Sequence, residues 1–321
     1  MKIAVYSYNS QKESFEGFEE QFGCSLLITE EKPDLHNIGF AEGAKAISVV
    51  TTPISGELIQ AFYDKGVRYI STRTIGYNHI DLEAADRIGM KIGNVTYSPH
   101  SVAEFAVMLI LMSLRKAKQM MASYQVQDFS VYRSMGGQLH NKVVGVIGTG
   151  NIGRTVISIL EGFGCKILAY DKYPNEKMKN YYVSFDELLE KSDVITLHIP
   201  MQPGEPYLID KRAISKMKDG AIIVNTARGQ LIDTDALIEG IETKHLGAAL
   251  DVLEDEQFYF KNKKNEILRN RNLAILRSFP NVILTPHFAF FTDQAVKEMA
   301  ENSISSCILE INGEENPWRR N

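Results

Sequence analysis

One segment, residues 143–171, restricts the fold of this 321-residue chain more than any other. It opens with five β-branched or small residues, 143–147, which are typical of a buried strand. A G-x-G-x-x-G turn follows directly, with its glycines at Gly148, Gly150 and Gly153. The predicted helix after the turn has its apolar stripe at Ile152, Val156, Ile159, Leu160 and Phe163. A second strand, 166–170, then ends at Asp171, so the segment predicts one strand–helix–strand unit.

The three glycines have separate physical uses in such a unit. Gly148 permits the tight turn out of the strand, Gly150 lets the backbone approach a pyrophosphate, and Gly153 lets the helix lie close to the sheet. The start of the helix adds free N–H groups. Asp171 can accept hydrogen bonds from ribose hydroxyls and would repel a 2′-phosphate, which predicts NAD rather than NADP. An ordinary crossover with a glycine turn is the alternative, and the strand, the helix and the terminal acid together favour the cofactor.

Composition and charge exclude several classes of protein. The chain is long enough for two domains of roughly 150 residues, and its 44% hydrophobic content supports sizeable cores. A formal charge of −5 offers no basic field for nucleic acid or for an anionic membrane, and the apolar run 105–114 is too short to span a bilayer. The three cysteines lie too far apart for a metal site or a disulfide framework. Without a signal-peptide core at the N-terminus, we expect a cytoplasmic protein.

The chain alternates strand and helix patterns on both sides of the fingerprint. Strands are predicted at 2–6, 46–50 and 68–71, with helices at 55–65 and 82–88 between them. This alternation predicts an α/β protein with doubly wound parallel sheets.

The fingerprint lies in the middle of the chain, after a predicted helix at 102–118. A Rossmann NAD-binding domain, 100–291, is therefore expected as an insertion in a flavodoxin-like substrate domain, 1–99 plus 292–321. A final helix, 292–310, would complete the substrate domain, and residues 256–272 would form a solvated loop and a surface helix.

Polar residues follow the later strands, which we predict at 193–199, 221–225, 247–250 and 282–284. Arg228, the acidic group from Asp251 to Glu256, and His287 stand just after strand ends, the edge where open α/β sheets bind ligands. An Arg can hold a carboxylate and polarise a carbonyl, and a His can deliver a proton near neutral pH. A carboxylate beside the His would orient it. Singly, each has another interpretation: a helix-capping Arg, a loop His, or a solvated charge run.

Five motifs stand out along the chain: GTGNIG, AYD, NTARGQLID, ALDVLEDE and NVILTPHFAFFTDQAV. Together they resemble the D-2-hydroxyacid dehydrogenase family, most closely its D-lactate and D-2-hydroxyisocaproate dehydrogenase branch. The resemblance covers nearly the whole chain from about Val67 onward. It implies an NADH-dependent, reversible reduction of a 2-oxo acid to the D-2-hydroxy acid.

The resemblance also implies roles for single residues. Arg228 would bind and polarise the substrate, Glu256 would be the catalytic glutamate, and His287 would be the general acid/base. The substrate would further meet the backbone amides of Ile75 and Gly76, the side chain of Tyr97, and Phe290. The implied cofactor contacts are Gly148, Gly150, Asn151, Ile152, Gly153, Asp171, Ile199, Pro200, Thr226, Ala227, Arg228 and Asp251, the last on the nicotinamide side. A homodimer built through the nucleotide domains is implied as well.

The chain departs from the family pattern at a few positions. Asn151 replaces the usual Arg or His, and Glu205 lies near a position where relatives often carry Asn. Val49 or Val50 stands where D-lactate enzymes tend to have Tyr, which would enlarge the pocket. Phe290 and Phe291 would give that pocket an apolar side and favour branched or aromatic substrates, because each buried methylene is worth about 0.8 kcal/mol. Thr96, where a cation would serve a second carboxylate, argues against a dicarboxylate.

A binding protein is the rival interpretation. Transcriptional corepressors that resemble this family sense NAD without turnover. The sequence has no segment that looks like a peptide-docking tail, and it retains Arg228, Glu256 and His287. Since function must be argued from the site rather than from the fold, the enzyme is favoured.

Overall fold

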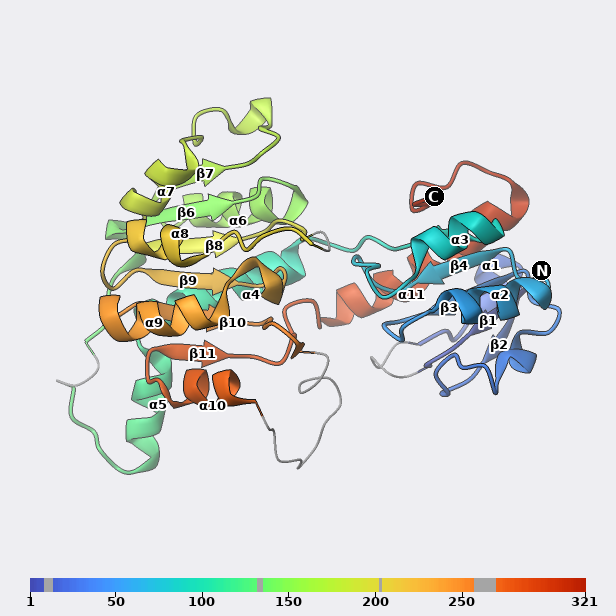
Figure 1. Ribbon diagram of the computed structural model, residues 1–321, viewed down its shortest axis with the longest axis horizontal. Helices are drawn as coiled ribbons and strands as arrows, with labels where there is room; N and C mark the ends of the chain where they lie inside the picture. The colour runs from blue at the N-terminus through green and yellow to red at the C-terminus, as the bar shows by residue number, and fades with distance from the viewer. Residues whose placement is uncertain (9–13, 132–134, 202–203, 257–269) are drawn as a thin grey trace. The chain divides into compact units, whose positions relative to one another are not determined.

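The structure is a computed structural model that describes residues 1–8, 14–131, 135–201, 204–256 and 270–321. The chain forms two compact units (Figure 1). The first comprises Met1–Ser98 and Phe291–Asn321, and the second comprises Pro99–Phe290. Each boundary lies one residue before the position expected from the sequence. The second unit is thus inserted between two segments of the first, as the mid-chain fingerprint indicates.

A five-stranded parallel sheet forms the centre of the first unit, in the order β2-β1-β3-β4-β5. This is the flavodoxin-like order, in which the chain adds strands to one side and then to the other. The strands are β1 (Lys2–Val5), β2 (Ser25–Ile28), β3 (Ala46–Val49), β4 (Tyr69–Thr72) and β5 (Lys91–Gly93).

Helices cover both faces of this sheet. One face packs against η1 (Ile38–Ala41), α2 (Gly56–Asp64) and α3 (Leu82–Ile88) through a core that includes Ile59 and Phe62. The other face packs against α1 (Phe18–Phe22) and α11 (Asp293–Asn312), where Ile304 and Cys307 are fully buried. The C-terminal helix α11 is therefore part of the first unit.

A six-stranded parallel sheet forms the second unit, in the order β11-β10-β9-β8-β6-β7. The order reverses at β6, which lies between β7 and β8, and such a switch point is where open α/β sheets bind ligands. The strands are β6 (Val143–Ile147), β7 (Lys166–Tyr170), β8 (Val194–Leu197), β9 (Ile222–Asn225), β10 (Gly247–Leu250) and β11 (Val282–Leu284).

This second sheet also has a helical layer on each face (Figure 1). On one side, α4 (His100–Leu114) and α6 (Asn151–Glu161) bury residues such as Leu109 and Leu160. On the other side lie α7 (Phe185–Lys191), α8 (Lys211–Lys216), α9 (Thr234–Lys244) and α10 (Arg271–Ser278). Short turns η3 (Leu139–Asn141), η4 (Glu176–Met178) and η5 (Gly229–Leu231) connect the layers. The fold class expected from the sequence, with two doubly wound parallel sheets, is confirmed.

Some expected elements are wrong in detail. The helix expected at 102–118 ends at Leu114, because Lys116 adopts a left-handed conformation (φ 51°) and a separate helix, α5 (Ala117–Gln125), begins after it. Phe163 does not join the buried stripe of α6, since that helix ends at Glu161 and Phe163 is 39% exposed. Within the segment expected as a solvated loop, residues 257–269 lie outside the described part of the chain. None of the described helices is both long and apolar enough to cross a membrane.

Candidate active site

The glycine turn connects β6 to α6 at the switch point. Gly148 has a φ of 95°, and a Cβ there would come within 2.5 Å of the His198 backbone oxygen. A Cβ on Gly153 would lie 1.8 Å from the Gly148 oxygen, so only glycine allows α6 to start this close to the turn. A Cβ on Gly150, by contrast, would meet no described atom within 4 Å. The turn therefore has open space at the position where a pyrophosphate would approach.

The start of α6 suits an anionic group. No side chain caps this helix, whose N-cap is Gly150, so its first N–H groups are left for a ligand. Asn151 is exposed, and its side-chain oxygen accepts a hydrogen bond from Arg154 Nη2 at 2.7 Å. Arg154 also donates from Nη1 to the Thr149 carbonyl at 3.3 Å. Sequence reasoning missed Arg154, whose guanidinium places a positive charge beside the turn, where Asn151 supplies none. The available signal was that Arg154 lies in the first turn of the helix that follows the glycine fingerprint.

Asp171 directly follows β7 and forms hydrogen bonds to the glycine turn. Its Oδ2 accepts hydrogen bonds from the backbone N–H and the hydroxyl of Thr149, at 2.6 and 2.9 Å. Its Oδ1 accepts from the Tyr173 N–H at 2.8 Å. The carboxylate thus stands beside the fingerprint, as a ribose contact requires. It also fixes the first residue after Gly148.

Other expected cofactor contacts lie at the same edge of the sheet. Ile152 is in the first turn of α6, and Ile199 and Pro200 follow β8. Thr226 follows β9 and is 9% exposed, and its Oγ1 is a buried atom without a hydrogen-bond partner among the described residues. A buried hydroxyl left unsatisfied by the protein is usually satisfied by water or a ligand. This hydroxyl and the open space at Gly150 are compatible with a bound dinucleotide.

The turn that carries Arg228 is held by a neighbouring amide. Asn225 is fully buried at the end of β9, where its Oδ1 accepts from the Ala227 N–H at 3.0 Å and its Nδ2 donates to the Arg228 carbonyl at 2.8 Å. Arg228 itself is half-buried and donates from Nη1 to the Ala227 carbonyl at 2.7 Å. Because its other guanidinium N–H groups donate to no described residue, they remain available for a carboxylate.

His287 and Glu256 form a close pair. The distance between His287 Nδ1 and Glu256 Oε1 is 2.6 Å, and the two side chains are 25% and 16% exposed. A carboxylate can only accept, so Nδ1 carries the proton of this hydrogen bond and Nε2 is left to exchange a proton with another group. The structure thus brings together two residues that are 31 positions apart in the sequence.

Asp251 organises the loop around His287. It is fully buried, and its carboxylate accepts hydrogen bonds from the Thr285 hydroxyl (2.6 Å) and from the N–H groups of Phe288 (2.8 Å) and Ala289 (2.9 Å). Its carbonyl accepts from the N–H of His287, a residue with a φ of 59°. The contact of Asp251 with the nicotinamide side stays a prediction, whereas its three internal hydrogen bonds show a role in shaping the His287 turn.

The residues expected to bind substrate are divided between the units. Ile75, Gly76 and Tyr97 belong to the first unit, whereas Arg228 and Phe290 belong to the second. The carbonyls of Ile75 and Gly76 accept hydrogen bonds from Asn94 Nδ2 and Thr74 Oγ1, both at 2.6 Å. Their N–H groups donate to no described residue, so the loop presents free amides.

The ring of Phe290 lies edge-on to His287, at 6.1 Å between centroids and an interplanar angle of 82°. Phe290 therefore gives the imidazole an apolar neighbour.

Two other residues that the sequence singled out lie in connecting segments. Tyr97 is half-buried in the segment after β5, and Glu205 is exposed in the segment after β8.

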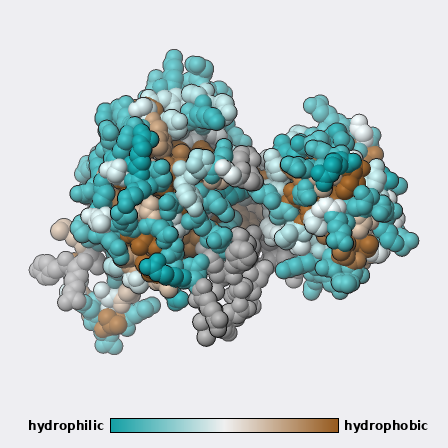
Figure 2. Space-filling model, in the orientation of Figure 1, coloured by the Kyte–Doolittle hydropathy of each residue, from teal (hydrophilic) through white to brown (hydrophobic). Residues whose placement is uncertain are grey.

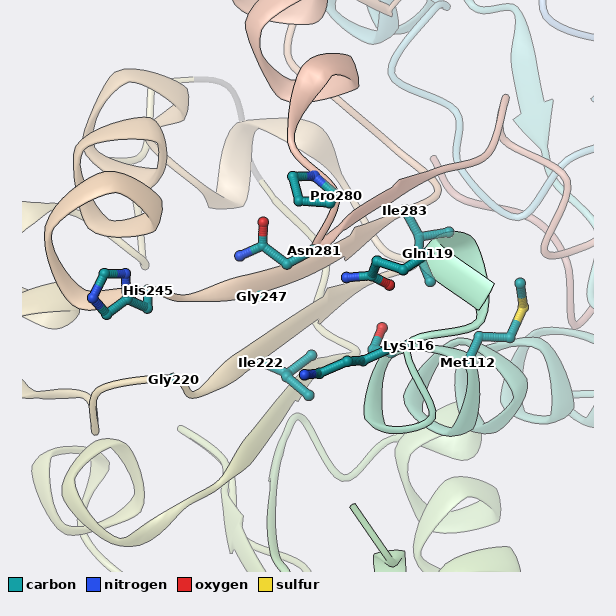
Figure 3. Close-up of a pocket in the computed structure, with 11 residues that line it drawn as sticks. Met112, Lys116, Gln119, Gly220, Ile222, His245, Gly247, Pro280, Asn281 and Ile283 are labelled. Carbon is teal, nitrogen blue, oxygen red and sulfur yellow. The ribbon is translucent and has the colours of Figure 1, made fainter. Parts of the chain in front are cut away.

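A cavity of about 260 Å³ lies elsewhere in the second unit, at the opposite edge of the sheet (Figure 3). Ile222 and Gly247, at the starts of β9 and β10, line it together with Lys116 and Gln119 beyond α4. Because the reactive residues follow the strand ends, this cavity is separate from the candidate site. No cluster suited to a metal ion occurs among the described residues.

Comparisons with known proteins bear on the whole chain. Residues 107–289 match the family described as D-isomer specific 2-hydroxyacid dehydrogenase, NAD binding domain. A D-specific alpha-keto acid dehydrogenase from Enterococcus faecium is 41% identical over 310 residues, covering 95% of this chain and 96% of the relative. An aromatic 2-oxoacid reductase from Clostridium sporogenes is 42% identical, with 94% and 93% covered.

Among solved structures, D-2-hydroxyisocaproate dehydrogenase superimposes with a TM-score of 0.91 at 32% identity, covering 100% of this chain and 99% of that one. The family expected from the motifs is therefore confirmed, and so is NAD as the cofactor. With its glycine turn, its strand-end residues and these relatives in agreement, the chain belongs to the D-isomer-specific 2-hydroxyacid dehydrogenase family.

Proposed function

We propose that this chain reduces a 2-oxo acid to the D-2-hydroxy acid with NADH, reversibly, and that His287 is the general acid/base. The His287–Glu256 pair at the edge that carries the NAD fingerprint is the observation that supports this assignment most. The Glu256 carboxylate orients the imidazole through Nδ1, so Nε2 is left to deliver a proton to the developing alkoxide. NADH, when bound, supplies the hydride.

Arg228 and the loop at Ile75 have complementary roles in this proposal. The free donors of Arg228 would bind the substrate carboxylate and polarise its carbonyl, because a guanidinium presents a rigid fork of N–H groups. The unengaged amides of Ile75 and Gly76 would add neutral donors for the carboxylate. In the oxidation direction, the same His287 nitrogen would accept the hydroxyl proton.

The substrate is expected to have a branched or aromatic side chain. Val50, just beyond the end of β3, is 4% exposed, whereas Val49 belongs to the core cluster beneath α2, so Val50 is the better placed of the two. Neither has the bulk of Tyr, and Phe290 adds apolar surface next to His287. Thr96 is already bound through its hydroxyl to Trp318 Nε1 at 3.0 Å, and a threonine offers no cation for a second carboxylate. One relative is named an aromatic 2-oxoacid reductase.

A spectrophotometric assay of NADH consumption tests the proposal. The panel is pyruvate, 4-methyl-2-oxopentanoate, phenylpyruvate and 2-oxoglutarate. Each methylene buried by the pocket should raise kcat/KM roughly fourfold over pyruvate. His287→Gln should abolish turnover while NADH still binds, as measured by its fluorescence. Turnover that survives in His287→Gln would contradict the assignment of His287.

The rival interpretation, an NAD-sensing binding protein without turnover, is not favoured. Two relatives that cover most of this chain have the names of enzymes, a dehydrogenase and a reductase. Arg228 and the His287–Glu256 pair also have the chemistry that turnover needs. The cytoplasmic location stays a prediction from the sequence, and fractionation of cells that produce the protein would check it.

A homodimer built through the nucleotide domains is also part of the proposal. Large apolar side chains stand exposed on α5 and just after it, and Figure 2 shows hydrophobic residues in this region at its lower left. They are Met120, Met121, Tyr124, Val126, Phe129 and Val131, each more than half exposed. Such a concentration is unusual on a monomer surface and is typical of an interface. Light scattering should give twice the 36.1 kDa mass of one chain.

A further inference from the structure

The loop that carries Glu256 has a second acid, Glu254, with a different set of partners. Glu254 Oε2 accepts a hydrogen bond from the Thr234 N–H at 3.0 Å and a short one from the Thr234 hydroxyl. The Tyr207 hydroxyl also donates to Glu254, and this hydrogen bond raises the pKa of Tyr207 to about 12. Glu254 therefore connects the loop to the start of α9 and to the segment that follows β8.

The same loop lies directly on the turn that follows Arg228. A Cβ on Gly229 would come within 2.0 Å of the Leu253 carbonyl carbon and 2.4 Å of the Glu254 nitrogen. Leu253 is 5% exposed, and its N–H donates to Glu256 Oε2 at 3.3 Å. Hence each carboxylate oxygen of Glu256 has a partner: Oε2 accepts from the Leu253 N–H, and Oε1 pairs with His287 Nδ1.

Helix capping alone does not account for Glu254. The N-cap of α9 is Asp233, whose side chain already accepts from the Ala236 N–H at 3.1 Å. Tyr207, moreover, is on another segment, one that is anchored where the Leu208 and Ile209 N–H groups donate to the Leu231 carbonyl. Glu254 thus connects the start of α9 and the segment that carries Tyr207 to the loop of Glu256, which is two residues further along the chain.

We propose that Glu254, with Tyr207 as its partner, is a positioning residue that holds Glu256 against His287. This inference rests on the proposed function, because it concerns the reduction of 2-oxo acids by the same site. The partners of Glu254 include Thr234 and Tyr207, so it acts on Glu256 through the loop that carries both acids. If the anchor is weakened, Glu256 spends less time at 2.6 Å from His287, and the imidazole is held less firmly in the orientation that proton transfer needs.

The experiment compares Glu254→Gln with Asp255→Asn in the full-length enzyme. Asp255 is the matched control, because it is adjacent and exposed, loses the same charge, and has a φ of 56° that Asn tolerates. The measurements are kcat and KM for 2-oxo acid reduction, together with NADH binding by fluorescence.

Glu254→Gln should lower kcat roughly tenfold with little change in KM, a loss expected for a misplaced acid/base pair. NADH affinity should stay near the wild-type value, since the change acts on the orientation of the acid/base pair and not on binding. Asp255→Asn should keep the wild-type kcat. Tyr207→Phe should lower kcat by a smaller factor than Glu254→Gln, and it carries the test if Glu254→Gln does not fold.

Two results would overturn the inference. One is a wild-type kcat in both Glu254→Gln and Tyr207→Phe. The other is a loss of kcat accompanied by a comparable rise in KM or loss of NADH binding, which indicates a merely structural role. Failure of the proposed function would look different, because the wild-type enzyme would then consume no NADH with any 2-oxo acid, and both proposals would be rejected together.

Discussion

Replacing Asp251 by Asn removes a charge from the centre of the His287 loop while almost preserving side-chain shape. The carboxylate is fully buried and accepts three hydrogen bonds, from Thr285, Phe288 and Ala289, at 2.6 to 2.9 Å. Asn keeps one acceptor oxygen and replaces the other by an NH₂ group. That group would face either the Ala289 N–H or the two donors from Thr285 and Phe288.

The expected loss of stability follows from these contacts. A hydrogen bond to a charged group contributes about 1.5–3 kcal/mol, and a buried donor left facing another donor adds a desolvation penalty of about 1–3 kcal/mol. The free energy of unfolding of the second unit should therefore fall by about 2–5 kcal/mol. His287 is also affected, since its φ of 59° is a left-handed conformation that costs roughly 1–2 kcal/mol and is maintained by the bonds around it.

Catalysis should decline for a geometric reason. A displacement of the imidazole by about 1 Å is enough to lower kcat by a factor on the order of 100. Stability is measured by urea unfolding followed by far-UV circular dichroism. Tryptophan fluorescence is unsuitable, because the single tryptophan, Trp318, lies in the first unit and reports on that unit only. Steady-state reduction of the best 2-oxo acid measures kcat, and NADH fluorescence measures cofactor affinity. Asp219→Asn, at a side chain that is 81% exposed in the same unit, is the control.

The outcomes separate two roles for Asp251. Reduced stability and kcat with nearly unchanged NADH affinity supports the loop-shaping role. Stability within about 0.5 kcal/mol of the Asp219→Asn control, together with unchanged kcat, would refute the reasoning from the three hydrogen bonds. Weaker NADH binding without loss of stability would instead support the direct cofactor contact expected from the family.

Two further predictions concern the nucleotide-binding edge. Asp171→Ala should narrow the preference for NADH over NADPH, because the carboxylate that would repel a 2′-phosphate is gone; an unchanged ratio of the two kcat/KM values would exclude Asp171 from the ribose role. Removal of the imidazole from water lowers the pKa of His198 to about 3, so below its ordinary value of about 6.5 the unfolded chain binds a proton that the folded chain does not. Stability should therefore fall as pH decreases, by about 1.6 kcal/mol between pH 6.5 and pH 5, and His198→Gln should make urea unfolding less sensitive to pH over this window.

Local sequence signals predicted much of the fold and the candidate site. Strands β6, β7, β10 and β11 have the expected bounds, because buried strands of a parallel sheet are continuous apolar runs that end at a polar residue or a glycine. The edge strands β2 and β5 were not predicted. In β2 both end residues are exposed and the middle two are only partly buried, and β5 has a single large apolar residue, so neither has the uniformly buried apolar run of a central strand.

By itself, then, the sequence determined the inserted layout, the NAD fingerprint and the strand-end positions of Arg228, Glu256 and His287, because glycine turns and apolar periodicity are local properties. Only the tertiary structure decided which hydrogen-bond partner each of the neighbouring acids faces. Asp251 faces the His287 loop, Glu254 faces Thr234 and Tyr207, and Glu256 faces His287. These partners are between 20 and 47 positions away along the chain. A carboxylate acquires its role from the donors that folding brings within 3 Å, and no local pattern encodes that distance.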